Sequence, residues 1–169
     1  MAQGKLGVGF RTMSDDGAAT MIMNSMFGGT STSKLFLNVR EKLSLCYYAG
    51  SSYHRKKGLI TVSSGIETKN YQRALVEIMT QLEALRRGEW EDWELEGARS
   101  SLRNALRSME DSASALEDFT MGQMATGSDE TIPGLLSAVE AVTPERVRQA
   151  AEQVRPDTIY FLKGKEAEE

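Results

Sequence analysis

The chain has 169 residues, of which 40% are hydrophobic and 26% charged, and its formal net charge at pH 7 is −4. This length and apolar content suffice to bury one substantial core. The acidic residues are scattered and no basic stripe interrupts them, which argues against nucleic acid or an anionic membrane surface as a partner.

The number of cysteines and the lengths of the apolar segments indicate the cellular compartment in which the protein is expected. The single cysteine, Cys46, cannot form an internal disulfide, so the fold does not depend on an oxidising environment. No stretch approaches the ~20 apolar residues that cross a bilayer, and residues 1–5 lack the apolar core of a signal peptide. We expect a soluble, cytoplasmic protein, and strand-like sequence so near the start fits a fragment of a longer polypeptide.

The first quarter of the sequence predicts a strand followed by two helices. Alternation predicts a strand over residues 6–12, and helical spacing predicts a buried helix over 18–27. We expect glycines 28 and 29 to end this helix in the left-handed cap conformation. Hydroxyl residues 30–33 can cap a second helix. Its expected inward stripe is Leu35, Phe36 and Val39, with Arg40 near its last turn.

Two strands and a long helical region follow. Residues 45–53 and 59–66 predict a hairpin, because the polar loop between them carries a glycine at position 58 that can take the required positive φ. Apolar residues at helical spacing then predict helices over residues 71–85, 90–109, 116–125 and 135–140. For the second of these helices, the expected inward stripe is Ala98, Leu102, Ala105, Leu106 and Met109. Thr143 and Pro144 predict one more helix start, and residues 158–162 a final strand.

The predicted order of elements defines the fold class. Strand, helix, two strands, helical region and strand form the split β-α-β-β-α-β unit of ferredoxin-like folds, with its second helix expanded into a helical region. We therefore predict an α+β fold in which helices cover one face of an antiparallel sheet. Residues 1–164 are expected to form one domain, and residues 165–169 an acidic, solvated tail.

The sequence gives little support for a metal site or for a catalytic nucleophile. The one histidine, His54, lies in a basic loop and the one thiol is Cys46, so a catalytic zinc ligand set cannot be assembled from this chain. A serine or cysteine nucleophile needs a base within reach, and His54 beside Lys56 and Lys57 is a poor one. We interpret His54 as a surface residue and Cys46 as packing within a strand.

Arg40 and Tyr47 are the candidate site residues. A helix that ends a few residues before a strand can bring a guanidinium and a phenol to one carbonyl oxygen. Spacing alone leaves a structural reading open, because the helix dipole favours arginine near a C-terminus and tyrosine is common in strands. Tyr47 and Tyr48 should point to opposite faces of the strand, one packed and one free.

Several segments together resemble a known family of peptidases. They are Phe-Gly-Gly at 27–29, Ser-Lys-Leu-Phe at 33–36, Val-Arg-Glu-Lys at 39–42, Leu-Cys-Tyr at 45–47 and the closing strand at 157–164. This pattern resembles the C-terminal half-domain of the insulinase (pitrilysin) zinc metallopeptidases, which include mitochondrial processing peptidase. One departure is Ser44, where many members carry glycine.

The resemblance implies a division of labour between two homologous α+β halves that enclose a chamber. The N-terminal half binds zinc through a His-x-x-Glu-His helix, and the C-terminal half supplies an arginine and a tyrosine that contact the substrate backbone. By position these are Arg40 and Tyr47. The implied partners are a zinc-binding half-domain or homologous subunit and a peptide substrate; zinc would reside on that other half, and this chain alone would not hydrolyse peptides.

Two other functions remain open at this point. The chain can come from a catalytically inactive family member that serves as a scaffold or assembly subunit, or from an unrelated α+β binding module. For an isolated half of a chamber we also expect weak homodimerisation, because the surface that a partner covers would be exposed.

Overall fold

The computed structural model describes residues 3–163. The strands are β1 Gln3–Thr12, β2 Cys46–His54, β3 Leu59–Glu67 and β4 Val154–Leu162. The α-helices are α1 Gly17–Asn24, α2 Tyr71–Arg86, α3 Asp92–Glu110, α4 Ala113–Thr126, α5 Ile132–Glu140 and α6 Pro144–Glu152. Two π-helical segments, η1 Ser25–Gly29 and η2 Leu35–Lys42, follow α1, and the 3-10 turns η3 Arg55–Lys57 and η4 Thr68–Asn70 flank β3.

The four strands form one antiparallel sheet in the order β2-β3-β1-β4. Val8 of the central strand β1 pairs with Val62 on one side and Ile159 on the other. This order, with a helical region before the last strand, confirms the predicted α+β split β-α-β-β-α-β arrangement. The first and last strands in the sequence, β1 and β4, are both longer than their patterns predict, since β1 starts at residue 3 and β4 at residue 154.

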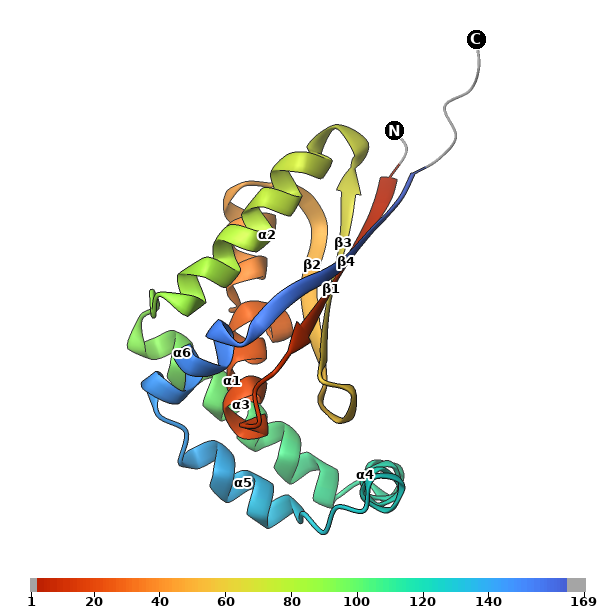
Figure 1. The fold of residues 1–169 in the computed structure, drawn as a ribbon, viewed down its shortest axis with the longest axis vertical. Coiled ribbons are helices and arrows are strands. Elements are labelled where there is room, and N and C mark those ends of the chain that lie inside the picture. Colours follow the sequence, from red (N-terminus) through yellow and green to blue (C-terminus); the bar gives the residue numbers. More distant parts are fainter. Residues whose placement is uncertain (1–2, 164–169) are drawn as a thin grey trace.

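Helices cover only one face of the sheet, as Figure 1 shows, and α4 and α5 extend past the tip of the β2–β3 hairpin. Alternation in β1 explains this choice, because Leu6, Val8 and Phe10 are buried whereas Lys5 and Arg11 are exposed. Among residues 3–163, no helix covers the opposite face of the sheet.

The core lies between the sheet and helices α1 and α2. Phe10 of β1 meets Phe27 of η1 edge to face, with ring centroids 6.1 Å apart. The helical spacing predicted over residues 71–85 is confirmed in α2, where Ile78, Leu82 and Leu85 are fully or almost fully buried and Tyr71, Leu75 and Met79 are partly buried. Burying side chains of this size contributes about 2 kcal/mol each. The predicted start of α6 is also confirmed, with the hydroxyl of Thr143 accepting from the backbone N–H of Arg146.

Three local expectations were wrong. Gly28 and Gly29 do not adopt a positive φ, because the chain leaves η1 through an extended residue, Thr30. Ala105 is exposed, since α3 turns this side away from the core, and Phe36 is only half-buried. The predicted acidic tail at 165–169 lies outside the described residues. None of the helices among residues 3–163 has the length and apolar character needed to span a membrane.

Gly28 instead allows the backbones of η1 and β2 to approach each other closely. A Cβ at this position would lie 2.6 Å from the backbone N of Ser51 and 2.8 Å from Cδ1 of Leu35. The absence of a side chain therefore lets η1 lie directly against β2.

Replacing Gly28 by alanine should destabilise the fold by about 2 kcal/mol, because the methyl group forces η1 away from β2. Chemical denaturation measures this change. Gly97→Ala is the matched control: it lies inside α3 with nothing within 4 Å of an added Cβ, and it should stabilise by up to about 1 kcal/mol. Equal effects of the two substitutions would contradict the close approach.

An ion pair fastens the tip of the hairpin to the segment between α4 and α5. The guanidinium of Arg55 donates through both terminal nitrogens to the carboxylate of Glu130, one bond measuring 2.8 Å. These hydrogen bonds hold the pKa of Glu130 below its ordinary value. Because the unfolded chain then binds more protons, this pair stabilises the fold above the ordinary glutamate pKa and loses its effect as pH falls below it.

Glu130→Gln should therefore cost about 1 kcal/mol at pH 7 and much less near pH 3. Unfolding free energies measured across this pH range give the difference. Glu117→Gln, an exposed position on α4, provides a control for loss of one negative charge. A penalty that is constant with pH would contradict the assigned ion pair.

Candidate functional site

The connection between η2 and β2 carries both predicted site residues. Leu35 and Val39 of η2 and Leu45 after it are buried in the core. The backbone N–H of Leu45 donates to the carbonyl of Val39 at 3.0 Å, and that of Leu43 donates to the carbonyl of Asn38 at 3.1 Å. Apolar anchors and backbone hydrogen bonds thus hold this connection in one conformation.

Ser44 turns the chain from η2 into β2. Its φ is 49°, and among the described residues it is the one residue other than glycine with a positive φ. This left-handed conformation costs an L-residue about 1 kcal/mol, and glycine adopts it without strain.

Arg40 lies in the last turn of η2, as predicted. Its guanidinium carbon stands 4.6 Å from the centroid of the Phe36 ring, one helical turn earlier, and Nη1 lies 3.5 Å from a carboxylate oxygen of Glu41. The side chain is still 39% exposed. The face of the Phe36 ring attracts the guanidinium of Arg40 by a cation–π interaction. Part of the hydrogen-bonding capacity of this guanidinium still faces solvent.

Tyr47 is the extra residue of a β-bulge. Cys46 pairs with Ile66 and Tyr48 pairs with Gly65, so Tyr47 has no partner on β3. Tyr47 is 56% exposed and Tyr48 is 44% exposed. The expectation that one of these tyrosines packs was wrong, because the bulge interrupts alternation on an edge strand whose outer face no helix covers.

Electrostatic effects indicate which groups lie near the start of β2. Burial raises the pKa of the Cys46 thiol, and Ser64 and the charge of Arg40 act in the opposite direction. Glu67 raises the pKa of Lys69 by accepting its hydrogen bond at 2.7 Å, with a smaller contribution from Tyr47. Arg40 therefore affects the pKa of Cys46, and Tyr47 affects the pKa of Lys69, at the same end of the sheet.

The donor set of residues 3–163 does not fit zinc. No group of three or more His, Cys, Asp and Glu side chains comes together in this part of the chain. His54 is exposed and its Nε2 lies 3.1 Å from the hydroxyl of Thr61, in agreement with its interpretation as a surface residue. Cys46 is half-buried and packs against the core, as expected of a strand cysteine.

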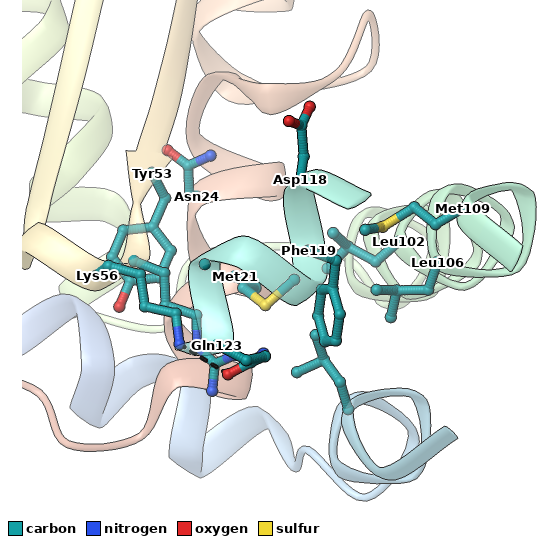
Figure 2. Close-up of a pocket in the computed structure, with 13 residues that line it drawn as sticks. Met21, Asn24, Tyr53, Lys56, Leu102, Leu106, Met109, Asp118, Phe119 and Gln123 are labelled. Carbon is teal, nitrogen blue, oxygen red and sulfur yellow. Dashed lines mark hydrogen bonds between the residues drawn. The ribbon is translucent and has the colours of Figure 1, made fainter. Parts of the chain in front are cut away.

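Sequence patterns did not reveal a cavity of about 400 Å³ beside α4. Figure 2 shows Asn24, Tyr53 and Lys56 at one end and Leu102, Leu106 and Met109 at the other. Met21, which makes residues 18–27 apolar nearly all round, lines this cavity.

Fold and motif together define a metallopeptidase half-domain. Residues 1–102 match the family described as "Peptidase M16 inactive domain". The chain belongs to this family, which confirms the resemblance seen in the sequence.

Proteins from two bacteria agree with this assignment. The chain is 40% identical over 168 residues to "Probable inactive metalloprotease YmfF" of Bacillus subtilis (strain 168), covering 97% of this chain and 39% of that protein. Identity to "Uncharacterized zinc protease YmxG" of the same organism is 27% over 137 residues, or 79% of this chain and 34% of that protein. The crystal structure of a conserved protein from Enterococcus faecalis V583 superimposes with a TM-score of 0.88 at 34% identity, over 98% of this chain and 40% of the other.

The chain thus spans about two fifths of the length of the first of these relatives and of the Enterococcus structure. Its matched segment corresponds to one part of each longer polypeptide.

Relief of backbone strain at Ser44 gives a direct test of the connection. Ser44→Gly should raise the unfolding free energy by about 0.5–1 kcal/mol, because glycine takes the observed φ without steric cost. Ser52→Gly is the matched control in extended β2 and should lower the unfolding free energy by a similar amount. Destabilisation by both substitutions would rule out a strained turn at position 44.

Proposed function

We propose that this domain forms one wall of a peptidase chamber and offers Arg40 and Tyr47 to the backbone of an extended peptide near the bond to be cut. The observation that carries the proposal is a difference in burial among residues of the short segment that joins η2 to β2. Leu35, Val39 and Leu45 are buried, whereas Arg40 and Tyr47 remain accessible on the same rigid connection.

The chemistry required is donation to a carbonyl oxygen. Negative charge builds on this oxygen as water attacks the peptide bond, and donors fixed in advance stabilise it most effectively. A guanidinium and a phenol both present N–H or O–H donors. Phe36 and Glu41 position the guanidinium of Arg40, and the bulge turns Tyr47 out of the β2–β3 ladder.

Zinc and the attacking water belong to another polypeptide segment in this proposal. YmxG, a relative named as a zinc protease, supports it, as does the finding that this chain spans two fifths of the length of YmfF. The partner would be an N-terminal zinc-binding half-domain or a homologous subunit, working with this domain in the cytoplasm. Exposed Met121 and Met124 on α4 support weak self-association of the isolated domain.

A scaffold function is the second candidate. It is favoured by the 40% identity to a protein named as a probable inactive metalloprotease. In this case the domain would stabilise an assembly and Arg40 and Tyr47 would have no catalytic consequence.

Peptide cleavage by the domain combined with a zinc-bearing half tests the first candidate. Arg40→Ala and Tyr47→Phe should each lower kcat/KM by about 10–100-fold, because each removes a donor to the carbonyl oxygen. Tyr48→Phe is the matched control on the next residue of β2, and Arg148→Ala is a control on α6. Both controls should retain full activity.

Unchanged rates in Arg40→Ala and Tyr47→Phe would contradict direct participation in the reaction. Zinc content of the assembled protein separates the two candidates: one zinc per assembly with cleavage supports the chamber wall, and a stable assembly without zinc or cleavage supports the scaffold.

A further inference from the structure

The cavity beside α4 is distinct from the Arg40 and Tyr47 unit. Tyr53 lines the cavity from the far end of β2, six residues after Tyr47, which corresponds to about 20 Å of extended strand. The remaining walls come from α1, η3, α3, α4 and α5. The two sites therefore lie at opposite ends of β2.

One end of the cavity is apolar. Leu102, Leu106 and Met109 of α3 and Phe119 of α4 surround it, with Met21 of α1 alongside (Figure 2). The volume of about 400 Å³ falls in the range of small-molecule pockets. Such a surface favours a compact hydrocarbon or aromatic body.

The other end has an acceptor in need of a donor. Asn24 is 9% exposed, and its carboxamide oxygen has no hydrogen-bond partner among residues 3–163. Figure 2 shows this oxygen on the β2 side of the Asn24 amide, shielded from solvent, and because the last torsion of asparagine is broad, a half-turn about it exchanges the positions of the oxygen and the amide nitrogen. A buried acceptor without a partner costs about 1–3 kcal/mol, which a ligand donor would recover.

The cations of the lining, Lys56 and Arg55, are already engaged, and the carboxylate of Asp118, which also belongs to the lining, disfavours an anionic ligand. The ammonium of Lys56 donates to the side chains of Gln123 at 3.1 Å and Thr126 at 3.0 Å, and Arg55 is bound to Glu130. A ligand carboxylate would bring negative charge toward the Asn24 oxygen, whereas a neutral hydroxyl or N–H can donate to it.

We propose that this cavity binds a small neutral amphiphile, with its aromatic or aliphatic body against α3 and a single hydroxyl or N–H group donating to Asn24. The site does not depend on the peptidase function. α4 forms its lid, and among the residues of this helix Gln123 alone is buried, so the lid can adjust to a ligand with little loss of core packing.

The test uses 4-propylphenol and propylbenzene, which differ by one hydroxyl group. NMR titration of protein labelled at the methionine methyl groups reports on the cavity through Met21 and Met109 and on its outside through Met13. Each of the two compounds should change the chemical shifts of the Met21 and Met109 methyl groups and leave that of Met13 unchanged. The phenol should bind about tenfold more tightly, because it alone donates to Asn24.

Two variants examine the two ends of the cavity. Asn24→Leu should abolish the preference for the phenol while propylbenzene still binds. Gly122→Leu should weaken both probes at least about tenfold, because Gly122 lines the cavity and an added Cβ there meets nothing within 4 Å. Gly97→Leu, a helical glycine on α3 with equal space but outside the cavity, should bind both probes like the parent chain.

Three results would overturn the proposal. They are equal affinity for the two probes, retention of the phenol preference in Asn24→Leu, and tighter binding of 4-propylbenzoate than of 4-propylphenol. If Asn24→Leu does not fold, the comparison of Gly122→Leu with Gly97→Leu decides whether the probes occupy this cavity. These outcomes are independent of peptide cleavage, so failure here leaves the chamber-wall proposal unaffected.

Discussion

Burial of Leu35, Val39 and Leu45 is the constraint on which the candidate site depends. These three side chains anchor η2 and the first residues after it to the core, and Gly28 lets the preceding segment lie directly against β2. The connection must therefore turn sharply, which Ser44 achieves in a left-handed conformation. This anchoring holds the backbone at Arg40 and Tyr47 while both side chains stay accessible, and preorganised donors need a backbone held in this way.

The one-sided cover of the sheet has consequences at both ends of β2. At its start, the uncovered face and the bulge leave Tyr47 and Tyr48 exposed. At its far end, the hairpin reaches α4, which contacts the rest of the molecule through few buried side chains. The same sheet thus supports a rigid connection at one end and a loosely covered cavity at the other.

Local chemistry made much of the fold predictable from the sequence. The hairpin follows from a polar loop ending in Gly58, the stripe of α2 from helical spacing, and the start of α6 from Thr143 before a proline. These features depend on residues a few positions apart. The sheet order then follows from the β-α-β-β-α-β succession.

Features set by distant contacts escaped sequence reasoning. The need for glycine at position 28 arises from Ser51, and the bulge at Tyr47 arises from pairing with β3. The cavity at Asn24 forms only where α1 meets α3, α4 and the hairpin. For the candidate site, spacing identified Arg40 and Tyr47 as a pair that can converge, but the functional interpretation came from the family resemblance.

The most direct measurement is a crystal structure of this domain assembled with a zinc-bearing half whose glutamate base is replaced, with an uncut peptide bound. The account predicts that a guanidinium nitrogen of Arg40 and the phenol oxygen of Tyr47 lie about 3 Å from the carbonyl oxygen of the bond to be cut. A peptide held with both groups more than about 6 Å from this oxygen, and with no bridging water, would contradict the account.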